Sequence, residues 1–225
     1  MNPEMLLEHF DRISDTPDAI PQLRRFVLEL AVRGKLVQQN DADDSASELV
    51  STVRLERKRL IDRGVIKNGR VFPKVREAEK PYSIPCEWEW IHLGESLIMT
   101  NGRPFKPTDW RNTGLPIVRI QNLNNRNAPF NYCDESRVDP NHVIDSGSFL
   151  ISWSGTPGTS FGAFIWDRGK AALNQHIFKC SQVGQAYDDR FLRIAVNGRL
   201  DEMISKAHGG VGLQHITKDK LYRAS

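Results

Sequence analysis

Residue combinations that catalyse reactions or bind metal ions are scarce in this sequence. Residues 209–212 are glycine-rich but lack the Lys-Ser/Thr pair with which a phosphate-binding loop holds a nucleotide and magnesium. Glu56-Arg57-Lys58 has the spacing of a nuclease site, yet it falls on the polar face of a predicted helix, where such charges are common. The histidines are scattered, and the cysteines are too far apart for a paired zinc site. We therefore predict no catalytic residues and no metal site, and a small nuclease that uses Glu56 is the weakest alternative.

Side chains that can recognise DNA bases are concentrated in residues 119–126. Arginine can bond two atoms of guanine, and Asn or Gln can bond two atoms of adenine, so these residue types suit base-specific contacts. The segment leaves an apolar run, 117–120, for a polar loop, which would present these side chains on a rigid base. We expect DNA contacts from Arg119, Gln121 and Arg126. For Asn122 and Asn124, bonding to the backbone of a turn is an equally good explanation.

Two further loops have compositions that suit DNA contacts. Gly102 permits an unusual turn, after which Arg103 and Lys106 would flank phosphates or a groove. In the second loop, Ser154 and Thr156 are surrounded by glycine, so backbone amides there would approach phosphate closely. Both loops are weaker candidates than residues 119–126, because small residues and glycine are common in loops of every kind.

The last group of DNA-facing candidates follows the glycine-rich residues 209–212. Its members are Gln214, His215, Lys218 and Lys220. Two other polar or aromatic features favour a structural explanation. Trp110 with Arg111 could make a stacking contact, but we expect Trp110 to be buried, because tryptophan is buried more often than not. Residues 174–176 interrupt an apolar run and could read bases, but we expect them instead to form a buried hydrogen-bond network.

The first 80 residues are predicted to be mainly helical. Apolar residues recur at helix spacing from 23 to 31, and Ser45 with Glu48 forms a capping-box pattern ahead of a second stripe at 46–60. We expect the two helices to pair as a hairpin. The face opposite the second stripe carries four basic side chains that we expect to be solvated, namely Arg54, Arg57, Lys58 and Arg63.

From residue 81 onwards, short apolar runs alternate with turn residues. The runs contain β-branched or aromatic residues and are bounded by Gly, Pro, Asn or Asp, as β-strands are. They lie at 90–93, 117–120, 149–152, 163–166 and 171–179. Helical spacing returns at 188–196 and less distinctly at 200–207. The sequence therefore predicts an α+β fold, with a helical hairpin region in 1–80 followed by a mixed α/β domain of short twisted strands in 81–225.

Composition narrows the possible partners without identifying one. There are 31 basic and 28 acidic residues, and the net charge of +3 is too mild to indicate nucleic-acid binding by itself. No stretch approaches the roughly 20 apolar residues that span a bilayer. The amino terminus does not have the pattern of a secretory signal, and the three widely spaced cysteines fit a reducing compartment. We expect a cytoplasmic protein.

An ordered set of short motifs resembles the specificity subunits of type I restriction–modification systems. The helical part supplies LAVRGKLV at 30–37 and ASEL at 46–49. The second part supplies IPCEWEW at 84–90, PIVRIQNL at 116–123 and ALNQHIFK at 172–179, followed by GLQHI at 212–216. No single motif is specific, but their order and approximate spacing are, and the resemblance extends with gaps from about residue 20 to residue 221.

The resemblance implies a subunit that reads DNA and has no catalytic activity of its own. In this family, a target-recognition domain reads one half of a bipartite DNA target, while helices hold the methyltransferase (modification) subunits and the complex adds a restriction subunit. S-adenosylmethionine would bind the modification partner and ATP the restriction partner, and neither would bind this chain. After packing against the second helix, the first helix would help to dock the methyltransferase through Leu23, Phe26, Val27, Leu30, Arg33 and Lys35.

The family pattern continues beyond the point where this sequence ends. A typical member would continue after Leu221 into a spacer helix and a second recognition domain. Two explanations stay open: a fragment of a longer subunit, which we favour because a further helix would be needed to pair with residues 21–63, or a half-subunit that works as a homodimer. An alternative function is a truncated interaction module that binds the methyltransferase subunit without recognising DNA.

Overall fold

Two long helices precede all the strands of the computed structural model, which describes residues 18–40, 42–66, 70–155, 161–199, 214–215 and 217–225. They are α3 (Ala19–Val32) and α4 (Ala46–Asp62). Gly34 has a φ of +65°, which lets the chain turn away after α3. The hydroxyl of Ser45 accepts a hydrogen bond from the Ser47 amide and caps the start of α4. Both helices were predicted from their apolar spacing.

The first sheet is antiparallel and has apolar cores on both sides. Its strands, in spatial order, are β1 (Leu97–Asn101), β9 (Ile177–Gln182), β5 (Phe149–Ser152) and β7 (Gly162–Ile165). Side chains alternate along β5, so Phe149 and Ile151 enter the core beneath the helices α5 (Leu93–Ser96), α7 (Asp189–Gly198) and α9 (Lys218–Arg223). Leu150 points the other way into a second core. This two-sided burial explains why the run at 149–152 is apolar throughout.

The second sheet contains the only parallel strand pair among the described residues. Its spatial order is β3 (Asn131–Cys133), β2 (Leu115–Val118), β8 (Ala171–Leu173) and β4 (Val143–Ile144). β2 and β8 run parallel with Val118 opposite Leu173. Because parallel strands end at the same edge of a sheet, the residues after Val118 lie beside those after Leu173. A two-stranded ladder of β6 (Ser154–Gly155) and β10 (Gln214–His215) completes the strands.

Short helical turns make the remaining connections in the described part of the chain. One is α6 (Ile120–Asn124), which follows β2 directly. The others are the 3-10 turns η1 (Glu77–Glu79), η2 (Pro107–Asp109), η3 (Glu135–Arg137) and η4 (Pro140–His142). None of the helices in the described ranges is both long and apolar enough to cross a bilayer.

The predicted α+β class is confirmed, and most predicted strands lie where their runs indicated. The run at 171–179 is two strands, β8 and β9, with a turn between them. The strand predicted at 90–93 is wrong, because α5 begins at Leu93. The helix predicted at 200–207 lies outside the described residues. The domain boundary at residue 80 stays a prediction.

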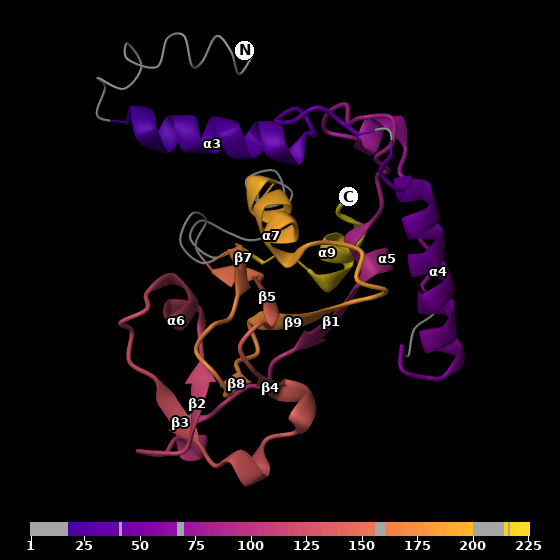
Figure 1. Cartoon of the computed structure of the whole chain (residues 1–225). Helices are drawn as coiled ribbons and strands as arrows, with labels where there is room; N and C mark the ends of the chain where they lie inside the picture. Colours follow the sequence, from indigo (N-terminus) through magenta and orange to yellow (C-terminus); the bar gives the residue numbers. More distant parts are fainter. Residues whose placement is uncertain (1–17, 41, 67–69, 156–160, 200–213, 216) are drawn as a thin grey trace.

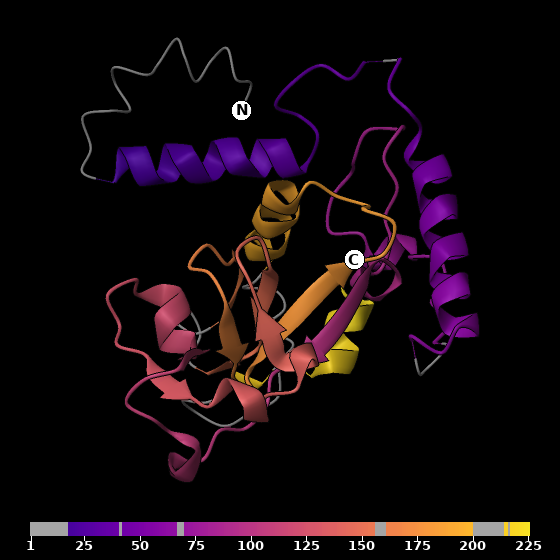
Figure 2. The same ribbon diagram turned by 60° about the horizontal axis from the view of Figure 1, so that its bottom comes forward.

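The predicted pairing of the first two helices is wrong. α3 packs against α7, and α4 packs against α5. In both views, α3 crosses one end of the molecule while α4 runs along its side (Figures 1 and 2). The physical reason is that the domain itself offers apolar surface to each helix. Val50 and Val53 of α4 are buried in this way, whereas Leu23, Phe26, Val27 and Leu30 of α3 are only half-buried.

Candidate nucleic-acid interface

A pocket of about 370 Å³ lies where β2 and β8 end side by side. Its lining includes Phe105 and Trp110 from one segment, Arg119 and Gln121 from a second, and Gln175 and His176 from a third. The elements that carry it, β2, β8 and α6, lie at the end of the molecule away from α3 (Figure 1). The parallel strand pair therefore gathers aromatic and base-reading residue types from three distant parts of the sequence.

Backbone hydrogen bonds hold the three segments together. The Asn174 amide donates to the Val118 carbonyl at 3.1 Å, and the Arg103 amide donates to the Leu173 carbonyl at 2.9 Å. The Gly102 amide donates to the Ile177 carbonyl at 3.1 Å. A Cβ atom at Gly102 would lie 2.2 Å from the carbonyl oxygens of Leu173 and Asn174, so only glycine fits there. The lining residues are thus carried on a fixed backbone frame.

Arg119 and Gln121 lie at this pocket, as expected of base-reading residues. The Arg119 backbone amide donates to Oδ1 of Asn122 at 3.0 Å, but its guanidinium forms no hydrogen bond or ion pair with the described residues. Gln121 is exposed, and the one hydrogen bond that its side chain makes to another described residue, to the Pro129 carbonyl, is long at 3.4 Å. Both side chains are therefore available to a ligand.

Arg126, the third expected base contact, has an internal partner. It is exposed and lies 2.7 Å from the carboxylate of Asp167. That hydrogen bond, with the positive charge of Arg126, lowers the pKa of Asp167. An exposed pair of this kind is weak, so Arg126 stays a prediction but a poorer one than Arg119.

Asn122 is not available to a base. It is 1% exposed, and its side-chain amide donates to the carbonyls of Ala128 and Pro129 while its oxygen accepts from Arg119. The turn-stabilising explanation is therefore the right one for Asn122. Asn124 is exposed and also bonds to its own turn, through the Ile120 carbonyl at 3.3 Å.

Arg103 ties two loops together, and its expected position beside phosphates or a groove stays a prediction. Its guanidinium donates to the Arg137 carbonyl at 2.7 Å, lies 3.4 Å from Asp109 and covers the Phe105 ring at 4.6 Å. The Lys106 backbone amide and then the Arg103 charge lower the pKa of Asp109, so that carboxylate is ionised at neutral pH. Lys106 is exposed, and its ammonium group forms no ion pair with the described residues.

The two remaining loops meet through a short strand pair. β6 pairs with β10, so that Ser154 lies opposite His215. Ser154 is 4% exposed, so its side chain is not available to a ligand, and the predicted phosphate contact through backbone amides stays a prediction. Thr156 lies outside the described residues, as do the side chains of Gln214 and His215.

The two lysines of α9 differ in exposure. Lys218 is exposed, donates through Nζ to the Met99 carbonyl at 2.5 Å and lies over the rings of Phe178 and Tyr222. Lys220 is half-buried. Lys218 and Lys220 stay predictions as DNA contacts.

Two residues were misjudged from the sequence. Trp110 is 42% exposed and lines the pocket, although tryptophan of unknown context is expected to be buried. Gln175 is exposed on the turn between β8 and β9, with its amide nitrogen 3.2 Å from Nε2 of His176, instead of lying in a buried network. The polar composition of 174–176 was the sequence signal that could have indicated a contact with bases. The position of these residues at the pocket depends on β8 running beside β2, which no local sequence pattern shows.

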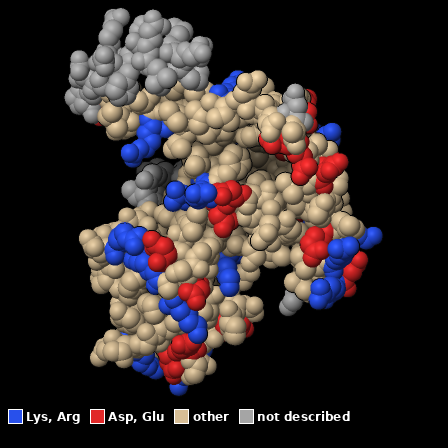
Figure 3. Space-filling view, in the orientation of Figure 1, with Lys and Arg blue, Asp and Glu red and all other residues tan. Residues whose placement is uncertain are grey.

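Charge does not single out this surface. On the face shown in Figure 3, basic and acidic side chains lie next to one another without forming a field of one sign. Within the described ranges, no three His, Cys, Asp or Glu residues gather closely enough to hold a metal ion. Neither charge nor a metal-binding cluster therefore marks this face as a binding site.

Comparison with known proteins identifies the family. The chain is 41% identical over 202 residues to the type I restriction enzyme EcoEI specificity subunit of Escherichia coli, covering 84% of this chain and 34% of that subunit. It is 33% identical over 145 residues to the EcoAI specificity subunit of the same species, covering 64% of this chain and 24% of that subunit. The chain belongs to the type I restriction enzyme specificity subunits. It spans about a third or less of the length of these relatives.

Solved structures of such systems give a partial structural match. The HsdS subunit from Thermoanaerobacter tengcongensis matches with a TM-score of 0.47 at 16% identity, covering 98% of this chain and 45% of that one. A chain of a type I R-M system matches with a TM-score of 0.46 at 15% identity, covering 92% of this chain and 45% of that one. No protein-family model matches the sequence.

The helical part of this specificity-subunit chain has an apolar surface. Eight of the nine large hydrophobic side chains that are exposed in the described part lie in it, namely Ile20, Leu28, Leu36, Val37, Leu49, Leu55, Val65 and Val71. Among the predicted partner contacts, Lys35 is exposed, while Arg33 pairs with Glu29 and covers the Tyr82 ring at 5.0 Å. These side chains are spread over α3, α4 and the segments that follow each helix. Exposed apolar side chains that gather on one face are typical of an interaction surface.

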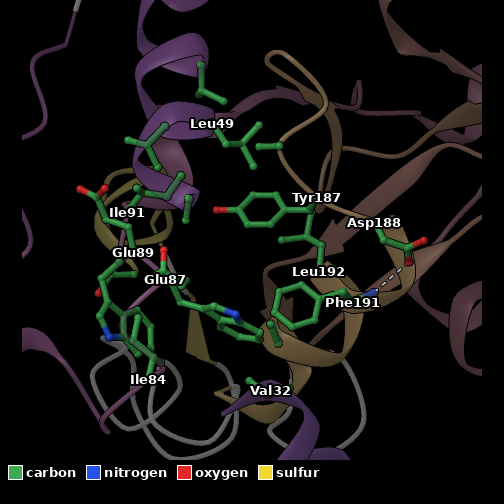
Figure 4. A pocket seen from close by; sticks show the side chains of 18 of the residues that line it. Val32, Leu49, Ile84, Glu87, Glu89, Ile91, Tyr187, Asp188, Phe191 and Leu192 are labelled. Atoms are coloured by element: carbon green, nitrogen blue, oxygen red, sulfur yellow. Dashed lines mark hydrogen bonds between the residues drawn. The ribbon is translucent and has the colours of Figure 1, made fainter. Parts of the chain in front are cut away.

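A second pocket, of about 470 Å³, lies between this surface and the domain. Leu49 of α4 faces Tyr187, Leu192 and Phe191 across it, and Ile84 lies along a third side (Figure 4). Burial raises the pKa of Tyr187, so its phenol is neutral at physiological pH. The pocket is lined mainly by apolar and aromatic side chains, in contrast to the polar lining at β2 and β8.

Proposed function

We propose that this chain is the DNA-reading part of a type I specificity subunit, that it recognises one half of a bipartite target, and that it has no catalytic activity of its own. The observation that carries the proposal is the position of Arg119 and Gln121 at an exposed pocket, with the guanidinium unpaired among the described residues. Residues 81–225 would form the recognition domain and residues 1–80 the docking region. The protein would work in the cytoplasm, where the DNA is.

Recognition would combine two kinds of contact. Basic side chains such as Lys106 would bind phosphates, which gives affinity but no sequence preference. Arg119 would donate two parallel hydrogen bonds to a guanine edge, and Gln121 would bond a neighbouring base. The fixed backbone frame beneath them would keep these side chains in register with the base pairs.

Replacing Arg119 tests the proposal. Arg119→Ala should lower the preference for the target over random duplex by about tenfold, because one bidentate contact discriminates by roughly 1–3 kcal/mol. Binding to random duplex should change little. Competition binding of the chain with its methyltransferase partner measures both quantities.

The matched control for that variant is Arg190→Ala. Arg190 is an exposed arginine on α7 that pairs with Asp188, and α7 covers the first sheet far from the pocket. This variant should keep the target preference. If the unmodified chain shows no preference for any duplex, even with the methyltransferase present, the proposal is wrong.

The exposed apolar surface of the helical part supports docking to a methyltransferase subunit, with S-adenosylmethionine bound by that partner and ATP by the restriction subunit. Leu28 and Val37 are 38% and 72% exposed, so Leu28→Glu with Val37→Glu should weaken partner binding and leave folding intact. A pull-down with the methyltransferase measures the loss. Partner binding without any DNA preference would instead favour the interaction-module function.

A further inference from the structure

The turn between β8 and β9 places Gln175 on the same pocket as Trp110. Gln175 is exposed, and within the described ranges its side chain bonds only to its neighbour His176, so its amide can donate and accept at once. Trp110 is the ninth exposed large hydrophobic side chain of the described residues, and it stands alone, away from the eight in the helical part. An amide and an apolar wall therefore face one concave site.

This combination matches the major-groove edge of one type of base pair. Adenine presents N7 as an acceptor and N6 as a donor, which a Gln amide can bond together. Its partner thymine presents a C5-methyl group, which apolar side chains contact. No other base pair offers both features side by side.

We propose that this pocket reads an A·T base pair, with Gln175 bonding the adenine and the Phe105 and Trp110 side chains contacting the thymine methyl group. The inference rests on the proposed function and adds to it two specificity-determining residues outside 119–126. Arg119, which also lines this pocket, would read the adjoining pair.

The backbone frame holds Gln175, Arg119 and the aromatic side chains in fixed positions relative to one another. The hydrogen bond from Asn174 to Val118 fixes the turn that carries Gln175 relative to Arg119. Arg103 covers the Phe105 ring at 4.6 Å and is held by Asp109 within the same loop, which fixes the apolar wall. A site with these supports recognises a base pair without first reorganising.

The test begins with the target sequence selected from random duplexes by the chain with its methyltransferase. Thymine is then replaced by uracil, which lacks the methyl group, at each A·T pair in turn. One replacement should weaken binding about fourfold, the value of one buried methyl group. The Trp110→Ala variant should lose a similar factor and no longer distinguish thymine from uracil at that pair.

Gln175 gives a second, independent readout. Gln175→Ala should lose the preference for adenine at the same pair by about tenfold. Gln175→Glu should shift the preference towards cytosine, because a carboxylate accepts from cytosine N4. Gln175→Glu is expected to gain a new base preference. A poorly folded protein could lose binding but could not gain such a preference, so this result does not depend on how well the variant folds.

The control is Arg190→Ala, the exposed arginine on α7, which should leave the selected sequence unchanged. If uracil is tolerated everywhere and both Gln175 variants select the original sequence while Arg119→Ala does not, this inference is overturned and the proposed function stands. If the unmodified chain selects no sequence, the proposed function fails first.

Discussion

The pocket at β2 and β8 and the attachment of α4 are built by different kinds of contact. Backbone hydrogen bonds from Gly102, Arg103 and Asn174 hold the pocket together. α4 is held by side chains instead, with Val50 and Val53 buried against the domain and Arg54 Nε 2.8 Å from the carboxylate of Glu95. Backbone contacts do not depend on side-chain identity except where, as at Gly102, a side chain would block them, whereas the contacts of α4 are made by the side chains themselves.

This difference has a functional consequence. A pocket framed by backbone can change its reading side chains, such as Arg119 or Gln175, without losing its shape. That property suits a surface whose task is to recognise a sequence. The helical part carries exposed apolar side chains, and replacing them would weaken the binding of a partner protein. We therefore expect a substitution in the backbone frame of the pocket and a substitution in the contacts that attach α4 to have separable effects.

The largest effect is expected from the frame. Gly102→Val would place methyl groups against the carbonyls of Leu173 and Asn174, where even a single Cβ atom comes within 2.2 Å. The overpacking should cost about 3 kcal/mol of unfolding free energy, because neither backbone can move freely. Target preference should be lost as well. Urea unfolding and competition binding measure the two effects.

Gly198→Ala is the matched control for the frame. Gly198 ends α7, and among the described residues no atom outside its own helix and its chain neighbours lies within 4 Å of a Cβ atom built there. Stability should stay the same or rise slightly, since alanine has less conformational freedom to lose. A Gly102→Val protein with normal stability and normal DNA preference would show that backbone contacts do not frame the pocket.

A smaller effect is expected from the attachment. Arg54→Met leaves the carboxylate of Glu95, which is 4% exposed, without its cationic partner. The cost should be about 2 kcal/mol, below the value for a fully buried pair because solvent reaches Arg54. DNA preference should survive in the folded fraction, which separates this variant from Gly102→Val.

Arg59→Met controls for the loss of a charge on the same helix. Arg59 pairs with Glu56 at 3.4 Å on the exposed face, so its replacement should change the melting temperature little. If the double variant Arg54→Met with Glu95→Gln is no more stable than Arg54→Met alone, an unpaired carboxylate is not the cause of the loss.

The elements that depend on local pattern could be predicted from the sequence. Ser45 caps α4 as expected, and Val50 and Val53 of the predicted stripe are buried. The opposite face was predicted to be solvated, yet Arg57 is 8% exposed over the Phe72 ring and Arg54 bonds Glu95. Those partners lie far along the chain, so helical spacing could not reveal them.

The residues of the candidate site also divide into those that the sequence could predict and those that depend on the folded structure. Residue types alone indicated Arg119 and Gln121, because Arg and Gln suit base edges and follow an apolar run. The position of Gln175 depends on the parallel pairing of β2 with β8, which no local pattern encodes. Asn122 was a base-reading type as well, but its burial is a property of the folded turn.

The smallest effect concerns Arg126, the paired arginine that contrasts with Arg119. Its hydrogen bond lowers the pKa of Asp167, so the pair stabilises the fold above the ordinary carboxyl pKa of about 3.9. That contribution is lost as the pH falls through the lower, folded-state pKa. In Arg126→Ala the pKa of Asp167 should return towards the ordinary value, as NMR titration of its carboxyl group would show.

Target DNA should leave the pKa of Asp167 low in the unmodified chain, because Arg119 reads the bases while Arg126 keeps its partner. A rise on DNA binding would mean that Arg126 leaves Asp167 for the DNA, and that both arginines make contacts there.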